Sequence, residues 1–241
     1  MTKTDDVTLA ERIEARAIEP GPRVERIEDN GRVFWIKRPE VLSLRMRLQK
    51  GDPVRAFAEE VAAHVAFAEQ GLPVAPVVLA TEAALVTEDC GPQLKHLARA
   101  GAAGFPDGLA AAAKALAEMH LAGHAHGRPS LKDICWRDGR IAFLDLERAG
   151  RTKNLARAQS FDVLVLIFST AVETGGNLSA MTLARDGYRD AGGAETLERA
   201  QTRARRFAPL AWLLRPIFRV LRGNREFDAV APFFAFMGQA D

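Results

Sequence analysis

Residues 126–145 of this 241-residue chain read His-Gly-Arg-Pro-Ser-Leu-Lys-Asp-Ile-Cys-Trp-Arg-Asp-Gly-Arg-Ile-Ala-Phe-Leu-Asp. The first nine residues are mostly polar and contain a proline, which predicts a loop. Asp138-Gly139 is a turn signal, and the apolar residues after it predict a strand over 140–144. The stretch is therefore a polar loop that contains Asp133, followed by a strand that ends at Asp145.

The residues on both sides of this stretch predict helices. Ala, Leu and Met recur at helical spacing over Leu109–Leu121, with Asp107 as the expected N-cap. Phe161–Val172 is largely apolar and predicts a helix that is buried on most sides. Further helices are expected up to Phe236, so the chain after residue 90 should be mainly helical.

The first part of the chain predicts a smaller unit in which strands dominate. Apolar alternation, turn signals and helical spacing indicate a short helix or strand followed by these elements: a strand at Arg23–Glu28, a turn at Asp29-Asn30-Gly31, a strand at Arg32–Arg38, a helix at Arg55–Gln70, and strands at Leu72–Leu79 and Ala84–Thr87. The whole chain is thus predicted as one α+β domain, 1–241, with a β-rich N-terminal lobe at 7–89 and a helical C-terminal lobe at 90–241.

The composition excludes several classes of protein. With 48% hydrophobic and 27% charged residues the chain is globular, which excludes disorder as its main state. Lys plus Arg total 33 and Asp plus Glu total 31, so the chain lacks the basic excess of a protein that coats nucleic acid. Its two cysteines, Cys90 and Cys135, exclude a disulfide framework and fit a reducing cytosol.

No segment is predicted to span a membrane. The strongest apolar stretch, Val163–Phe168, has six residues, whereas a spanning helix needs about 20. The polar segment Met1–Glu14 lacks the apolar region of a signal peptide. We therefore expect a cytoplasmic protein, with peripheral contact at the inner membrane as a further interpretation.

Four features occur in an order that resembles the protein-kinase-like fold. Lys37 lies in the apolar strand Val-Phe-Trp-Ile-Lys, Glu59 and Glu60 lie on the next helix, a His126 loop contains Asp133, and Asp145 closes a strand. Two phrases resemble the small bacterial lipopolysaccharide (Kdo/heptose) kinase-like and aminoglycoside-phosphotransferase-like branch: Glu-Gln-Gly-Leu-Pro-Val-Ala-Pro at 69–76 and Met-His-Leu-Ala-Gly-His-Ala-His-Gly at 119–127. The resemblance covers about residues 20–170.

In that fold a strand lysine holds the nucleotide's phosphates and is itself held by a helix glutamate. The resemblance assigns these roles to Lys37 and, from its spacing before Gly71, to Glu60. Glu59 would point about 100° away around the helix. A cationic side chain in an apolar strand also needs a partner, since an unpaired buried charge is costly. The competing interpretation is an edge-strand lysine whose ammonium reaches solvent.

The resemblance also implies ATP and Mg²⁺ as cofactors. Asp145 takes the place of the metal-binding Asp in the family's Asp-Phe-Gly motif, written here Asp-Leu-Glu, and Asp133 stands where the family has its second metal ligand, usually Asn. Both carboxylates suit Mg²⁺. Glu147 is either a further ligand or a solvated turn residue.

Arg128 is the main departure from the family's pattern. It stands five residues before Asp133, where the family has the catalytic Asp that receives the acceptor's proton. An arginine cannot receive a proton at accessible pH. Three explanations are open: the protein is a pseudokinase, another carboxylate such as Asp133 or Glu147 is the base, or Arg128 binds the γ-phosphate or an anionic acceptor.

The remaining matches concern structure and the adenine base. His126 matches a loop histidine that hydrogen-bonds backbone, and Asp162 matches the Asp that tethers the loop, with a helix-terminal charge as its alternative. The connector Thr87–Pro92 follows a strand, and by analogy the backbone of Glu88 and Cys90 would bind adenine. Only Glu19-Pro20-Gly21-Pro22 stands where the family has its glycine-rich phosphate loop. His120 and His124 are four residues apart, but they lack a third metal ligand and are interpreted as structural.

Two basic segments suggest partners other than the nucleotide. Arg148, Arg151, Lys153 and Arg157 stand in a segment without acidic residues, which either recruits an anionic acceptor or is an ordinary solvated loop. Residues 203–225 interleave seven arginines with apolar residues. This pattern predicts either a helix packed on the domain or one that lies on an anionic membrane surface.

Three hypotheses follow for function. The first is a Mg-ATP-dependent phosphotransferase that acts on a small molecule or a glycolipid sugar. The second is a pseudokinase scaffold that binds nucleotide or a protein partner. The third is an adaptor that binds the membrane surface through the C-terminal helix. No nucleic-acid partner is expected.

Overall fold

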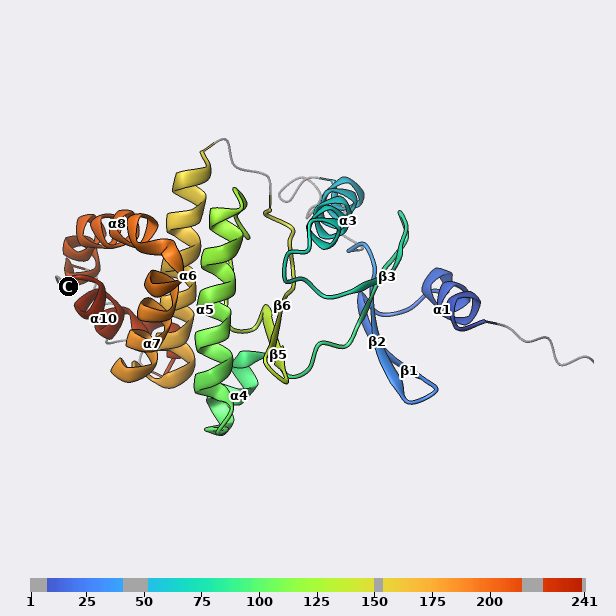
Figure 1. The fold of residues 1–241 in the computed structure, drawn as a ribbon, viewed down its shortest axis with the longest axis horizontal. Helices are drawn as coiled ribbons and strands as arrows, with labels where there is room; N and C mark the ends of the chain where they lie inside the picture. The colour runs from blue at the N-terminus through green and yellow to red at the C-terminus, as the bar shows by residue number, and fades with distance from the viewer. Residues whose placement is uncertain (1–7, 41–51, 150–153, 214–222, 240–241) are drawn as a thin grey trace, which may run out of the picture. The chain divides into compact units, whose positions relative to one another are not determined.

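The computed structural model describes residues 8–40, 52–149, 154–213 and 223–239. The chain divides into two compact units, Met1–Cys90 and Gly91–Asp241, called here the N-terminal unit and the C-terminal unit (Figure 1). The N-terminal unit has these elements in chain order: α1 (Leu9–Ile18), β1 (Val24–Asp29), β2 (Arg32–Lys37), α3 (Pro53–Glu69), β3 (Val77–Ala80) and β4 (Leu85–Glu88).

The N-terminal unit is built on an antiparallel sheet with strand order β1-β2-β4-β3. Asn30 and Gly31 both have positive φ (50° and 75°), the backbone that the predicted Asn-Gly hairpin turn requires. Strand β3 covers only the end of the predicted strand Leu72–Leu79. Pro73 and Pro76 explain the difference, because proline cannot donate a hydrogen bond to the sheet.

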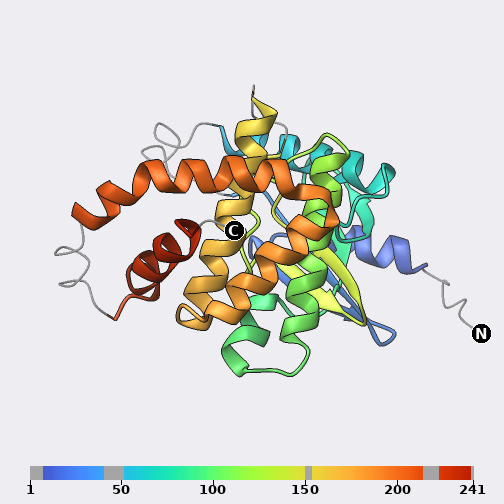
Figure 2. The ribbon, with the colours of Figure 1, turned by 60° about the vertical axis from the view of Figure 1, so that its left-hand side comes forward.

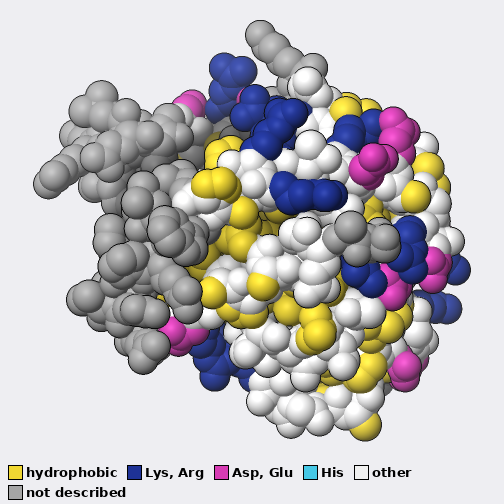
Figure 3. Space-filling view, turned by 90° about the vertical axis from the view of Figure 1, so that its left-hand side faces the viewer, with side chains coloured by type: hydrophobic (Ala, Val, Ile, Leu, Met, Phe, Trp, Pro, Cys, Tyr) yellow, Lys and Arg dark blue, Asp and Glu magenta, His cyan; other side chains and the backbone are white. Residues whose placement is uncertain are grey.

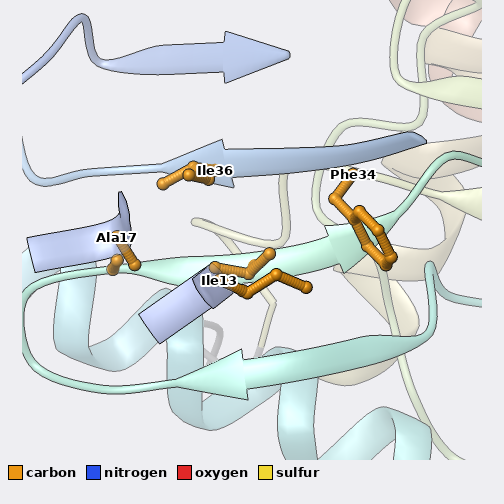
Figure 4. Packing of buried hydrophobic residues seen from close by; sticks show 6 residues of the cluster. Ile13, Ala17, Phe34 and Ile36 are labelled. Carbon is orange, nitrogen blue, oxygen red and sulfur yellow. The ribbon is translucent and has the colours of Figure 1, made fainter. Parts of the chain in front are cut away.

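Helix α1 covers one face of the sheet, and a hydrophobic core lies between the helix and the sheet. Side chains of a strand alternate between its two faces, so Phe34 and Ile36 of β2 point to the same side. There they pack with Ile13 and Ala17 of α1 and with Val86 of β4 (Figure 4). The chain before the hairpin, left open as helix or strand, is therefore a helix, and Thr8 caps it through a capping box with Glu11.

The C-terminal unit is a group of helices with one short hairpin (Figure 2). Its elements are α4 (Leu94–Ala100), α5 (Phe105–Leu121), β5 (Ile134–Arg137), β6 (Arg140–Phe143), α6 (Leu155–Thr174), α7 (Leu178–Tyr188), the π-helical turn η1 (Arg189–Gly193), α8 (Ala194–Leu213) and α10 (Arg225–Met237). Helix α5 packs against α7 and η1, and α6 packs against α4, α7, α8 and α10. Of the basic segment 203–225, residues 214–222 lie outside the described part.

Helix α6 is the central helix of this unit. Its 20 residues include an 18-residue window with a mean hydropathy of 1.4, which meets the length and composition of a membrane span. However, four other helices pack against it, and its buried polar residues Gln159 and Asp162 hydrogen-bond the loop before β5. These contacts identify α6 as a core helix of the folded unit.

Three boundaries in this unit differ from the sequence prediction. Helix α5 begins at Phe105 with Gly104 as N-cap, so Asp107 lies in the first turn and does not cap the helix. Gly104 is required there because a Cβ would lie 2.7 Å from the ring of Trp136. The prediction also missed strand β5, and it began α6 six residues too late, because Asn154 supplies the N-cap.

We expect α1 to be essential to the stability of the N-terminal unit. Ile13 is 2% exposed, so Ile13→Ala should cost about 3 kcal/mol through lost burial and the cavity left behind. Ile18→Ala, in the same helix at a side chain 69% exposed, is the matched control and should be close to neutral. Urea unfolding measures both variants, and equal destabilisation would show that α1 does not contribute to the core.

Candidate functional site

The N-terminal unit contains a buried ion pair between Lys37 and Glu60. Lys37 ends β2 on the face opposite Phe34 and Ile36, and its Nζ hydrogen-bonds to Oε1 of Glu60 on α3. The side chain of Glu60 is 4% exposed and that of Lys37 is 20% exposed. Glu59 points elsewhere and accepts a hydrogen bond of 3.0 Å from Nε of Arg55. Lys37 therefore does not extend freely into solvent, and its ammonium is held in place by a buried carboxylate.

His64 lies one turn beyond Glu60 on α3. Its Nε2 is 2.8 Å from the carbonyl oxygen of Ala75, which ties the helix to the chain before β3. Burial lowers the pKa of His64 below its ordinary value, and the positive charge of Lys37 lowers it further. The imidazole is therefore neutral at neutral pH, and Lys37 provides the cation here.

Some of the backbone groups predicted to bind adenine already make hydrogen bonds within the unit. The amide of Glu88 donates a 3.0 Å hydrogen bond to the carbonyl of Pro76, and the Glu88 carboxylate pairs with Arg32. The carbonyl of Glu88 is 3.4 Å from Sγ of Cys90. A carbonyl oxygen has two lone pairs, so this group can accept a second hydrogen bond from a ligand.

Sequence reasoning missed Arg38, the residue after Lys37. It is 8% exposed, and its guanidinium donates to the carboxylate of Glu25 at 2.8 Å and to the carbonyl oxygens of Arg16 and Pro22 at 2.9 and 3.1 Å. It therefore fixes the segment 19–22, for which the resemblance predicts the position of the phosphate loop, to β1 and α1. A basic residue directly after an apolar strand was the only sequence signal for it.

In the C-terminal unit, Asp162 holds the loop that begins at His126. Asp162 is completely buried, and its carboxylate accepts hydrogen bonds from the amides of His126 (2.8 Å) and Gly127 (2.9 Å). Gly127 has φ +96°, and a Cβ there would lie 2.5 Å from Cβ of Arg148. Asp162 is well inside α6, so the interpretation as a helix-terminal charge is wrong. The hydrogen bonds of Asp162 hold the loop against α6, as the tether interpretation predicted.

His120 extends this network and is not part of a metal cluster. Its Nδ1 is 2.6 Å from the hydroxyl of Tyr188, and its Nε2 is 3.3 Å from the Asp162 carboxylate. In the part of the chain that the structure describes, no group of three or more His, Cys, Asp or Glu side chains could hold a metal ion. Tyr188 was missed because nothing near it in sequence marks it. Gly193, whose Cβ would meet the Tyr188 ring at 2.2 Å, makes room for it.

His126 is fixed at both ring nitrogens. The amide of Arg128 donates to its Nδ1 at 3.3 Å, so Nε2 carries the proton and donates to the carbonyl of Leu144 at 2.9 Å. Burial lowers the pKa of His126, which keeps the ring neutral. Both contacts lie within the unit, and they connect the loop to the end of the β5–β6 hairpin.

The hairpin brings Asp133 and Asp145 together. Ile134 pairs with Phe143, and the amide of Leu144 donates to the carbonyl of Asp133 at 2.8 Å. The pKa of Asp133 is raised first by burial, against a 2.6 Å hydrogen bond from Ser130, and the negative charge of Asp145 raises it further. Asp145 itself has φ +60° just beyond β6. Two carboxylates thus share one end of the hairpin at an electrostatic cost that a bound cation would relieve.

The carboxylates of Asp133 and Asp145 fit a Mg²⁺ ion that also binds phosphate oxygens. Magnesium is commonly held by one or two carboxylates, with phosphate oxygens and water completing its six oxygen ligands. Asp133 and Asp145 supply hard oxygen donors from two sides of the hairpin end. Glu147 is 37% exposed and lies 3.9 Å from Nε of Arg148, so the solvated-turn interpretation agrees with its surroundings.

Arg128 lies beside this acidic pair. Its Nη2 is 3.8 Å from Oδ2 of Asp145, and Nζ of Lys132 is 3.9 Å from Oδ1 of Asp133. Each carboxylate therefore has a cationic neighbour from the same loop. Of the basic loop that follows, Arg151 and Lys153 lie outside the described residues.

Comparison with known protein sequences gives one match of unknown function. No family model matches the chain. An uncharacterized protein of Haemophilus influenzae is 30% identical in an alignment of 145 residues, with a coverage of 55% of this chain and 56% of that protein. The match thus spans about half the length of this curated relative.

A solved structure matches nearly the whole chain. The crystal structure of an aminoglycoside phosphotransferase from Alicyclobacillus acidocaldarius superposes with a TM-score of 0.55 at 12% identity, over 91% of this chain and 89% of that one. The chain therefore has the kinase-like α+β fold of phosphotransferases, with a small antiparallel sheet in the N-terminal lobe and a helical C-terminal lobe. The fold class predicted from the sequence is confirmed, and the closer likeness to lipopolysaccharide kinases stays a prediction.

The raised pKa of Asp133 predicts a gain of stability in Asp133→Asn. The unfolded chain releases this proton at a lower pH than the folded chain, so the folded state loses stability as pH rises from about 4 through the folded pKa. Without metal, the variant should melt higher than wild type at pH 7, on the order of 2–4 °C, and this advantage should shrink as pH falls towards 4.

Thermal melts in EDTA across this pH range measure the effect. Asp190→Asn is the control, since that side chain is 70% exposed. An advantage of Asp133→Asn that is the same at every pH would contradict an electrostatic origin.

Proposed function

We propose that the chain is a phosphotransferase that transfers the γ-phosphoryl group of Mg-ATP to a hydroxyl of a small molecule or a glycolipid sugar. Its kinase-like fold supports this class of reaction. The observation that carries the proposal is the Asp162-tethered loop, because it sets Asp133 and Asp145 together at one hairpin end, with a cation beside each. Phosphoryl transfer needs such positioning and charge compensation more than covalent chemistry.

Lys37 would bind the phosphates of the nucleotide. Its ammonium is oriented by a carboxylate that is itself buried, so little reorganisation is needed when an anion arrives. Because His64 is neutral, it adds no second positive charge beside Lys37. The carbonyl of Glu88 and the backbone of Cys90 would bind the adenine base.

Asp133 and Asp145 would hold Mg²⁺. When bound there, the ion would supply charge neutralisation and polarisation of the phosphoryl group. Within the protein, Asp162 and His126 keep the loop and the hairpin end in register, so both carboxylates are oriented before the ion binds.

Arg128 would bind the transferring phosphoryl group or an anionic acceptor. Its planar guanidinium presents forked donors that match phosphate oxygens. Since it cannot accept the acceptor's proton, that proton would pass to another carboxylate, Asp133 or Glu147, or to a phosphate oxygen. A loose transition state makes little demand on a base.

A pseudokinase that binds nucleotide or a protein partner is the second candidate. The observation that favours it is the Arg128–Asp145 distance of 3.8 Å, because a guanidinium at a metal ligand also compensates charge without any metal. In that case Arg128 stabilises an inactive loop.

ATP binding separates a nucleotide-binding protein from an inert scaffold. Ligand at about 100 times its Kd stabilises the folded state by about 2.7 kcal/mol, so ATP with Mg²⁺ should raise the melting temperature by several degrees. Lys37→Ala should remove most of the shift, and Asp145→Ala should remove the part that depends on Mg²⁺.

Thermal-shift titrations with and without Mg²⁺ measure these effects. Lys114→Ala, at a side chain 66% exposed on α5, is the control. A wild-type protein that ATP does not stabilise under either condition would refute both nucleotide-binding hypotheses.

The variant Arg128→Asp separates the enzyme from the pseudokinase. In the enzyme, it removes a phosphate-binding cation and adds a third negative charge, so transfer should fall about tenfold or more. In the pseudokinase, wild type transfers nothing, and an Asp at the family's base position is the change that would create activity.

Transfer of labelled γ-phosphate to extracted bacterial small molecules and glycolipids measures turnover. Arg140→Asp, at the exposed start of β6, is the matched control. No transfer by wild type, with transfer by Arg128→Asp, would establish the pseudokinase.

A further inference from the structure

Two segments of the C-terminal unit lack acidic residues and are rich in basic ones. The first runs from residue 148 to residue 161, and the second from residue 199 to residue 225. The second contains these arginines: Arg199, Arg203, Arg205, Arg206, Arg215, Arg219, Arg222 and Arg225. With a net charge of only +2 for the whole chain, the positive charge is concentrated in these segments.

The fold brings the two segments into contact. Nη1 of Arg203 on α8 donates a 3.3 Å hydrogen bond to the carbonyl of Arg157 on α6. Figure 2 shows α8 crossing α6 near the start of α6. Burial lowers the pKa of Arg203, and the charge of Arg157 lowers it further, so the two guanidinium groups repel each other. The fold tolerates this repulsion although both groups stay charged.

Each arginine has a phenylalanine one turn farther along its helix. Residues four apart are neighbours on a helix surface, which pairs Arg157 with Phe161 and Arg203 with Phe207. Phe161 is 41% exposed and Phe207 is 53% exposed, and Arg206 lies on the same side of α8 as Arg203. These five residues are called here the basic–aromatic surface. Figure 3 shows Lys and Arg side chains close to exposed hydrophobic ones on this side of the C-terminal unit.

No acidic side chain neutralises this surface in the described part of the chain. Arg199, one turn earlier on α8, pairs with Glu195, but the described residues offer no ion pair to Arg157, Arg203 or Arg206. The neighbouring segments 150–153 and 214–222, which the structure does not describe, contain no Asp or Glu in their sequence. The charge is therefore left for an external anion.

We propose that the basic–aromatic surface docks the protein on an anionic phospholipid bilayer. Guanidinium groups bind lipid phosphates, and exposed phenylalanines next to them enter the interface between headgroups and acyl chains. Arginines alone would fit nucleic acid or an acidic protein equally well. The two exposed phenylalanines, each one turn from an arginine, favour a surface with an apolar layer beneath its charges. This docking is independent of the proposed phosphotransferase function.

Sedimentation with vesicles tests the docking. The full chain should bind vesicles that contain phosphatidylglycerol and should not bind vesicles of phosphatidylcholine alone, and salt should weaken the binding. Arg157→Gln with Arg203→Gln should reduce partitioning on the order of tenfold or more. Phe207→Ala should also reduce it, while the protein keeps its melting temperature.

The matched control is Arg26→Gln with Arg55→Gln, which removes two charges from exposed side chains of the N-terminal unit and should leave binding unchanged. Equal loss in the control would reduce the effect to net charge and overturn the proposal, as would absence of binding to anionic vesicles. Free phosphate and a short RNA are the competing ligands. Tight binding of either one that depends on the two arginines but not on Phe207 would identify a soluble anion or RNA as the ligand and also overturn the proposal.

Discussion

The buried carboxylate of Asp162 is the constraint on which the functional part of the C-terminal unit depends. A fully buried charge is stable only if it is hydrogen-bonded, and Asp162 meets this need with the amides of His126 and Gly127 and with His120. Because these donors belong to one loop and the helix before it, the charge fixes the course of the loop. His126 then connects the loop to the hairpin end through its hydrogen bond to the carbonyl of Leu144.

The candidate site residues of the two units have opposite charges, and each unit holds its charged side chains in place in a different way. In the N-terminal unit, the buried carboxylate of Glu60 orients Lys37, so this long and flexible side chain is held in one conformation. In the C-terminal unit, Asp133 and Asp145 share one hairpin end, and the pKa of Asp133 is raised mainly by burial and further by the charge of Asp145. Each arrangement costs folding free energy that an ordinary core would not require, and such costs are typical of binding and catalytic sites.

Several elements follow from local sequence alone. The Asn-Gly turn predicted the first hairpin, and apolar runs located α6 and β6. The choice of Glu60 as the partner of Lys37 came from the family resemblance, and the structure shows this ion pair. The errors had two kinds of cause, one local and one from a distant part of the chain. Strand β5 has few residues and an arginine at its end, and the start of α5 is set by the Trp136 ring, which comes from a distant part of the chain.

The sequence by itself determined the order of the lysine, the glutamate, the histidine loop and the two aspartates, because side-chain periodicity and turn chemistry act over a few residues. Only the tertiary structure decided which of these groups are buried and paired. The fold pairs His120 with Tyr188 and Asp162, gives Arg38 four backbone and side-chain acceptors, and places Arg128 beside Asp145. Burial and pairing depend on packing between segments far apart in the chain, and a charge pattern read along one segment does not contain that information.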